Sequence, residues 1–128
     1  MELKIVVEGK PVPKGRPRFN MQGYAYTPRA TELAELGMAE AIRAACAQHG
    51  WQVSQKPLSV GMDFFLGAPA NPGQPYPAVK PDLDNLAKLV LDAMNGLVYD
   101  DDRRVISLVC RKGYGSPERT EIAVKEVL

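Results

Sequence analysis

A stretch rich in proline and glycine in the middle of the chain sets the strongest limit on how this sequence can fold. Residues 67–81 contain two glycines and five prolines, so neither a helix nor a central strand is expected to run through them. Loops of about fifteen residues in compact domains are usually functional or disordered. This one leads directly to Asp82, which favours a functional loop.

The segments on either side of this loop show the periodicities of strands and helices. Strands are predicted over 3–7, 58–66, 105–110 and 120–127, a short hairpin over 16–19 and 24–27, and helices over 28–49 and 83–96. Thr27 and Pro28 give the first helix a start signal, and its predicted apolar stripe contains Leu33, Leu36, Ala39, Ile42 and Cys46. This order predicts a small α+β single domain over residues 1–128, a mixed sheet with two helices on one face.

Bulk composition is that of an ordinary globular chain and excludes several classes of protein. The 128 residues are 45% apolar and 24% charged, with a formal net charge of +1. No signal-peptide pattern or apolar run of membrane length is present, so we expect a cytoplasmic protein without a membrane partner. Cys46 and Cys110 are too far apart for zinc-site spacing.

Charge is unevenly distributed along the chain. Basic residues dominate the first 29 positions, and acidic residues dominate 82–102, where Lys88 is the single cation. Such a division suits a metal-dependent nuclease, which needs cations to hold phosphates and carboxylates to hold metal ions. Lys14, Arg16 and Arg18 alternate and could line a DNA backbone, although charges that protect an edge strand would look the same.

The acidic region contains two groups of carboxylates separated by a helix. Asp82 and Asp84 lie at the predicted helix start, and Lys88 follows Asp84 by one turn on the same face. Asp100, Asp101 and Asp102 follow the helix. Clustered carboxylates repel one another unless a cation offsets them, and Mg²⁺ prefers oxygen ligands. Helix capping and a solvated turn are the alternatives.

Chain length decides how the two groups could meet. The helix is roughly 20 Å long, and residues 97–102 reach at most about 20 Å when extended. Asp102 therefore approaches Asp84 only if the segment doubles straight back, which we expect, or if it meets the acidic pair of a second subunit across a twofold axis. Tyr24 and Tyr26 could stack on bases, but we expect them to be packed.

Three segments together resemble the RusA family of Holliday junction resolvases. They are the Asp-Leu-Asp-Asn-Leu-Ala-Lys segment at 82–88, the Val-Tyr-Asp-Asp-Asp segment at 98–102 and the Gly-Lys-Pro-Val-Pro-Lys-Gly-Arg-Pro-Arg segment at 9–18. The resemblance implies a homodimeric, Mg²⁺-dependent endonuclease that makes paired nicks in four-way DNA junctions during recombination and repair. By position it implies that Asp82, Asp84 and Asp102 bind metal and that Lys88 is catalytic. Asp101 is the alternative third ligand in a shifted register.

Two other functions fit the same residues. A metal-dependent phosphohydrolase acting on a small nucleotide would use the same acids within a pocket. A non-catalytic DNA-binding module would use them only as caps and turns. In every DNA-binding interpretation, Lys14, Arg16, Arg18 and Lys80 are the expected phosphate contacts.

Overall fold

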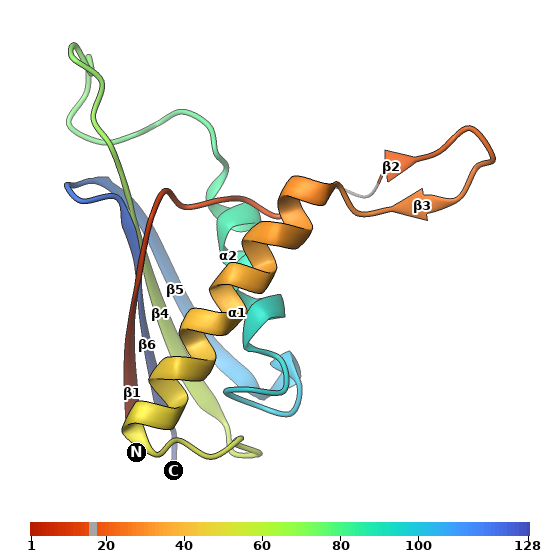
Figure 1. The fold of residues 1–128 in the computed structure, drawn as a ribbon. Coiled ribbons are helices and arrows are strands. Elements are labelled where there is room, and N and C mark those ends of the chain that lie inside the picture. The colour runs from red at the N-terminus through yellow and green to blue at the C-terminus, as the bar shows by residue number, and fades with distance from the viewer. Residues whose placement is uncertain (16–17) are drawn as a thin grey trace.

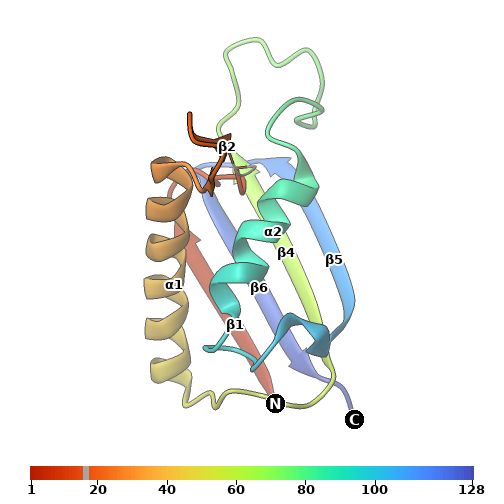
Figure 2. The ribbon, with the colours of Figure 1, turned by 90° about the vertical axis from the view of Figure 1, so that its right-hand side faces the viewer.

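The computed structural model describes residues 1–15 and 18–128. Its elements in chain order are β1 (Glu2–Glu8), β2 (Arg18–Phe19), β3 (Ala25–Tyr26), α1 (Arg29–His49), β4 (Leu58–Leu66), α2 (Leu83–Met94), the one-turn 3₁₀ helix η1 (Asp102–Arg104), β5 (Val105–Tyr114) and β6 (Arg119–Glu126). Both long helices lie on one face of a four-stranded sheet (Figure 1, Figure 2). The predicted α+β class, with a mixed sheet and two helices on one face, is confirmed.

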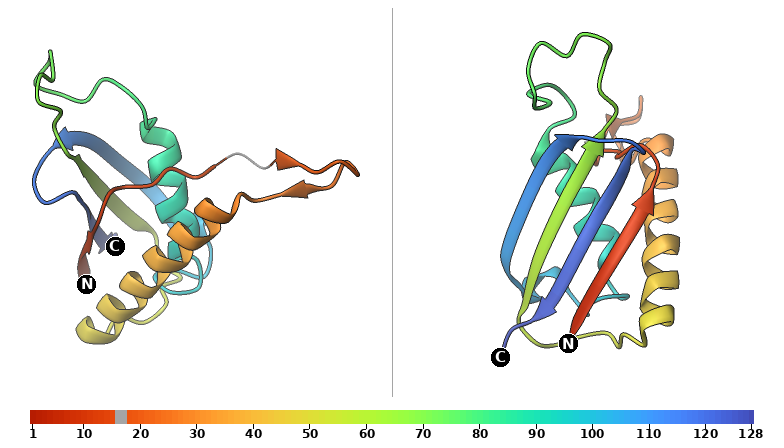
Figure 3. Two further views of the ribbon diagram at one scale, coloured as in Figure 1. Left: turned by 45° about the horizontal axis from the view of Figure 1, so that its top comes forward. Right: turned by 90° about the vertical axis from the view of Figure 1, so that its left-hand side faces the viewer.

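The sheet has the strand order β1-β6-β4-β5. β6 pairs antiparallel with both β1 and β4, whereas β4 and β5 run parallel, so the sheet is mixed. β4 alternates strictly between buried and half-buried residues, as expected of a central strand covered on one face. Its predicted bounds are confirmed to the residue. β5 is an edge strand, and β1 forms the opposite edge (Figure 3).

Helix α1 begins one residue later than predicted and buries only part of the predicted stripe. Pro28 occupies the N-cap position, and Gly50 ends the helix in the left-handed conformation with φ of 65°. Its buried residues are Thr31, Met38, Ile42 and Cys46. Leu33 and Leu36 are exposed, so that part of the predicted stripe is wrong. At about 100° per residue, Leu36 lies on the face opposite Met38.

Helix α2 covers the sheet with an almost continuous apolar face, and the chain after it is anchored in the core. Its buried residues are Leu86, Ala87, Leu89, Val90, Ala93 and Met94. The Tyr99 side chain is fully buried and its hydroxyl donates to the Leu91 carbonyl at 2.6 Å. The Trp51 indole donates to the Val98 carbonyl at 2.9 Å. These bonds fix the return path that delivers the chain to η1 and β5.

Two segments extend beyond the layered body. The β2–β3 hairpin projects away from α1 as an arm (Figure 1), and residues 67–82 form a loop beyond the end of β4 (Figure 2). The loop prediction for residues 67–81 is therefore confirmed. So is the hairpin, apart from residues 16 and 17, which lie outside the described residues. Within the described part of the chain, no helix is both long and apolar enough to cross a bilayer.

Candidate active site

The start of α2 presents two carboxylates to solvent. Asp82 is the N-cap residue, but its side chain makes no capping hydrogen bond, and Asp84 lies in the first turn. One Asp84 oxygen accepts from the neighbouring Asn85 backbone N–H at 3.0 Å. Both side chains are exposed. Capping therefore does not explain Asp82, and the positive end of the helix dipole favours negative charge at this position.

A second group of charges lies along the same helix, around Asp92. Asp92 pairs with Lys88 on one oxygen and with Lys14 on the other, each at 3.2 Å. Lys14 also donates to Glu35 of α1 at 2.6 Å. This hydrogen bond is the main reason why the pKa of Lys14 is raised, and the bond to Asp92 adds to it against an opposing effect of burial. The charges thus tie the loop before the arm to both helices.

Lys14 is therefore placed differently from the sequence-based expectation. We expected an exposed DNA contact, but the side chain is only 26% exposed and engages two carboxylates. Its backbone N–H also donates to the Asn85 carbonyl at 2.8 Å. In this structure Lys14 orients Asp92, and through Asp92 the ammonium group of Lys88.

The three consecutive aspartates after α2 occupy three different environments. Asp100 accepts two hydrogen bonds from Arg104, at 2.8 and 2.9 Å, which lower its pKa to about 2. Asp101 accepts from the backbone and guanidinium of Arg103, and its pKa is lowered. Asp102 has a raised pKa, first because of a hydrogen bond shared with Asp101 and then because of burial, whereas the charge of Lys88 acts in the opposite direction.

Ion pairing divides the six aspartates of residues 82–102 into two sets. Asp92, Asp100 and Asp101 each hold a lysine or arginine. Among the described residues, Asp82, Asp84 and Asp102 take part in no ion pair. The three carboxylates expected to bind metal are therefore the three that have no cationic partner in the described part of the chain.

A single chain does not gather these three carboxylates. No group of three or more His, Cys, Asp or Glu residues within the described part of the chain is arranged to hold an ion. The charges that act on Asp102 are those of Asp101, Lys88 and Asp92, not those at the start of α2. The structure therefore brings Asp102 to the Lys88 region but does not join it to Asp82 and Asp84.

A basic hollow lies beside the start of α2. It has a volume of about 610 Å³, and its lining includes Lys10, Lys14, Lys80, Asp82 and Asn85. Lysines and a carboxylate thus face the same space, as a site for a phosphate group and a cation requires. Lys80 is exposed here, and its role as a phosphate contact stays a prediction.

The arm carries exposed aromatic side chains next to Arg18. Phe19 and Tyr24 are more than 70% exposed, and Tyr26 is 47% exposed. The expectation that Tyr24 and Tyr26 are packed is therefore wrong. A hairpin whose two strands have two residues each is too small to bury them. Arg18 is exposed in β2. The predicted contact at Arg16 lies outside the described residues.

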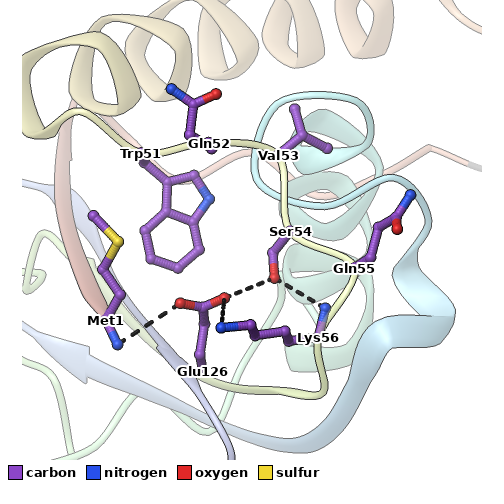
Figure 4. A pocket seen from close by; sticks show the side chains of 8 residues that line it. All are labelled: Met1, Trp51, Gln52, Val53, Ser54, Gln55, Lys56 and Glu126. Carbon is purple, nitrogen blue, oxygen red and sulfur yellow. Dashed lines mark hydrogen bonds and ion pairs between the residues drawn. The ribbon is translucent and has the colours of Figure 1, made fainter.

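A different hollow, at the opposite end of the sheet, has polar groups that satisfy one another (Figure 4). Its volume is about 500 Å³. Glu126 accepts from the Ser54 hydroxyl at 3.1 Å and lies 3.7 Å from the N-terminal amine. Ser54 in turn accepts from the Lys56 backbone N–H. No described carboxylate there lacks a partner, so we place no chemistry at this hollow.

Sequence reasoning missed two residues that shape the site. Asp92 was not among the predicted site residues, although its spacing of four residues from Lys88 indicates the ion pair that the structure shows. No motif or spacing in the sequence pointed to Lys112. Its ammonium donates to the carbonyls of Val79 and Pro81, at 2.7 and 2.9 Å, and so fixes the chain just before Asp82.

Together these features are those of one class of protein. Carboxylates without cations and a positioned lysine, beside a basic hollow on an α+β domain, are the parts of a hydrolase that acts on phosphate esters. The sequence pattern of the family described as endodeoxyribonuclease RusA matches residues 8–125. The chain belongs to the RusA endodeoxyribonuclease family. It is therefore a nuclease that hydrolyses phosphodiester bonds in DNA, and membership implies activity on Holliday junctions.

A bacterial relative is similar over nearly the whole chain. The protein YqaN of Bacillus subtilis (strain 168), which is described as uncharacterized, is 29% identical over 138 residues. The alignment covers 98% of this chain and 96% of that protein. The similarity therefore spans both the arm and the acidic region.

Proposed function

We propose that this chain is a homodimeric, Mg²⁺-dependent nuclease that resolves four-way DNA junctions by paired symmetric nicks in recombination and repair. The observation that carries the proposal is the division of the acidic residues. Asp82, Asp84 and Asp102 have no ion pair among the described residues, whereas the neighbouring acids are neutralised. Carboxylates that no lysine or arginine neutralises are the ones available to bind a metal ion.

The donor set fits a hard divalent cation. Mg²⁺ takes oxygen ligands and often binds through one or two carboxylates together with substrate phosphate. Asp82 and Asp84 would hold such an ion at the start of α2, and Asp102 would contribute from η1 of the second copy across the twofold axis of the homodimer. When bound, the ion would supply charge neutralisation at the phosphate and a nucleophile at neutral pH.

Lys88 would stabilise the negative charge that develops on the phosphate during hydrolysis. Its side chain is 56% exposed, so a phosphate can reach it. The ammonium is held by Asp92, which is itself held by Lys14. Lys88 is thus oriented before DNA arrives, which is the arrangement that electrostatic stabilisation of a transition state requires.

The basic hollow and the arm would hold the DNA. Lys80 and Lys10 face the hollow beside Asp82, where they would contact backbone phosphates. Arg18 would extend this contact onto the arm, and Phe19 and Tyr24 would stack on bases that are unpaired at a junction. A nucleotide phosphohydrolase would have no need of a projecting aromatic arm, so the arm favours the junction.

Substitution of Asp84 tests this proposal. Purified wild-type protein, Asp84→Asn and the matched control Glu40→Gln are incubated with a synthetic mobile junction and with linear duplex, with and without Mg²⁺. We expect symmetric nicks in the junction from the wild type and the control, only with Mg²⁺. Asp84→Asn should lose nicking while it still binds the junction in EDTA, because no cation that contacts DNA is removed. Nicking by Asp84→Asn at the wild-type rate would refute the assignment.

A further inference from the structure

Four side chains form a chain of alternating charge between α1 and α2. Glu35 of α1 accepts a hydrogen bond from Lys14 at 2.6 Å. Asp92 of α2 lies 3.2 Å from Lys14 and 3.2 Å from Lys88. The side chains of Glu35, Lys14 and Asp92 are 32%, 26% and 20% exposed, whereas that of Lys88 is 56% exposed. The chain of charges thus begins in a half-buried part of the molecule and ends at an ammonium group that faces solvent.

The backbone around Lys14 is held against both helices, so the fold sets the position from which its side chain extends. The Lys14 N–H donates to the Asn85 carbonyl at 2.8 Å, and the Gly15 N–H donates to the Thr31 hydroxyl at 3.2 Å. A Cβ at Gly15 would lie 2.6 Å from the hydroxyl oxygen of the buried Thr31, so the close approach requires glycine. Lys14 therefore reaches Asp92 from a fixed base.

The two lysines share one carboxylate. Lys88 contacts Oδ1 of Asp92 and Lys14 contacts Oδ2, at equal distances. Lys14 has a closer acceptor in Glu35, and that hydrogen bond is the largest cause of the raised pKa of Lys14. Without Glu35, Asp92 would be the one remaining ion-pair partner of Lys14 among the described residues. Because the attraction between unlike charges grows as they approach, Asp92 would then turn toward Lys14 and away from Lys88.

We propose that Glu35 is a positioning residue of the nuclease, which restrains Lys14 so that Asp92 stays on Lys88 and holds its ammonium group where the phosphate is cleaved. The inference rests on the proposed function for the role of Lys88. Electrostatic stabilisation needs groups that are oriented before reaction, and a misplacement of about 1 Å can cost about a hundredfold in rate. Since Glu35 lies on α1 and Lys88 on α2, the packing of the two helices becomes part of the geometry of the site (Figure 2).

The negative charge of Glu35 gives the opposite expectation for DNA binding. Lys14 also lines the basic hollow beside Asp82, so a carboxylate bound to Lys14 weakens the positive field that a phosphate meets there. Removal of that carboxylate should leave junction binding at least as tight as in the wild type, while it slows the chemical step. A variant that was merely partly unfolded would lose binding and nicking together.

Chemical labelling of Lys88 tests the inference without reference to activity. The free proteins are treated with a trace of acetic anhydride, and mass spectrometry compares acetylation of Lys88 with that of the exposed Lys125. A lysine held by a carboxylate reacts more slowly than a free one, because the opposite charge favours its protonated form. We expect Glu35→Gln to raise this labelling ratio severalfold. The matched control Glu32→Gln removes the same charge from the same helix, at a residue paired with Arg29, and should leave the ratio unchanged.

A second background separates an action through Lys14 from a direct effect of Glu35. In Lys14→Met the competing ammonium group is absent, so Glu35→Gln should cause no further change in the labelling of Lys88. Unchanged or reduced labelling in Glu35→Gln, an equal rise in Glu32→Gln, or the same rise with and without Lys14 would overturn the inference.

Junction nicking tests the consequence for the reaction. Single-turnover nicking is measured with saturating protein and Mg²⁺, and junction binding is measured in EDTA by fluorescence anisotropy. We expect Glu35→Gln to nick about tenfold more slowly with undiminished affinity, and Glu32→Gln to match the wild type in both. An unchanged rate, or a loss of affinity as large as the loss of rate, would also overturn the inference. If the wild type cut no junction with Mg²⁺, the proposed function would fail, while the labelling would still decide whether Glu35 positions Lys88.

Discussion

Replacement of Asp92 by asparagine should destabilise the fold by an amount set by the exposure of its two partners. The pair with Lys14 is partly buried, because Lys14 and Asp92 are 26% and 20% exposed. Such a pair contributes about 1 kcal/mol, whereas the pair with the 56% exposed Lys88 contributes a few tenths. Asp92→Asn should therefore lower the free energy of unfolding by roughly 1–1.5 kcal/mol, or lower Tm by about 3–6 °C in a chain of this length.

Urea unfolding followed by circular dichroism measures this loss. Glu40→Gln is the matched control, because Glu40 has the exposed Arg43 as its one ion-pair partner among the described residues. This substitution should cost less than about 0.5 kcal/mol. The pKa of Lys14 is raised from its ordinary value of 10.5. The contribution of the Lys14–Asp92 pair to stability is therefore complete below that value and is lost as pH rises through the folded pKa. The difference in unfolding free energy between Asp92→Asn and the wild type should shrink only in strong alkali. A loss no larger than that of the control would refute the reasoning.

Three further predictions concern single side chains. Tyr99→Phe removes the hydroxyl that satisfies the Leu91 carbonyl and should cost about 1–2 kcal/mol in urea unfolding; an unchanged midpoint would show that the bond contributes nothing. Arg104→Gln removes the partner that lowers the pKa of Asp100 from 3.8 to about 2. Stability from that pair is present above 3.8 and lost as pH falls toward 2, so in an acid titration the variant should be less stable than wild type at pH 5 and equal to it below pH 2. Phe19→Ala and Tyr24→Ala should leave Tm unchanged but weaken junction binding, measured by fluorescence anisotropy, by about 1–3 kcal/mol per lost stack; unaltered affinity would remove the arm from the DNA interface.

The sequence predicted the elements whose apolar residues favour a single face. Residues 58–66 alternate imperfectly, but Val60, Met62 and Phe64 share one face, and α2 has one apolar stripe, so the structure confirms both elements. The first helix contains apolar residues on two faces. Sequence spacing correctly selected Ile42 and Cys46, but it selected Leu33 and Leu36 where packing against the sheet buries Met38. Only the direction of approach to the sheet, which is a tertiary property, distinguishes the two faces.

The site was predictable in composition but not in arrangement. Asp82, Asp84 and Lys88 share one helix, so their proximity follows from local geometry. The position of Asp102 depends on the path of residues 95–101, which is set by the buried Tyr99 and the bond from Trp51 to Val98. The role of Lys14 could not be predicted either, because Glu35 and Asp92 come to it from two different helices.

The contact from Lys112 to the Pro81 carbonyl has a thermodynamic consequence for an enzyme built in this way. Lys112 belongs to β5, so the chain just before Asp82 is tied directly to the sheet. A cation that binds at Asp82 only in the folded protein would raise the free energy of unfolding, and such linkage is reciprocal. A change that breaks this contact would therefore weaken cation binding by the same free energy that the bound cation adds to the contact.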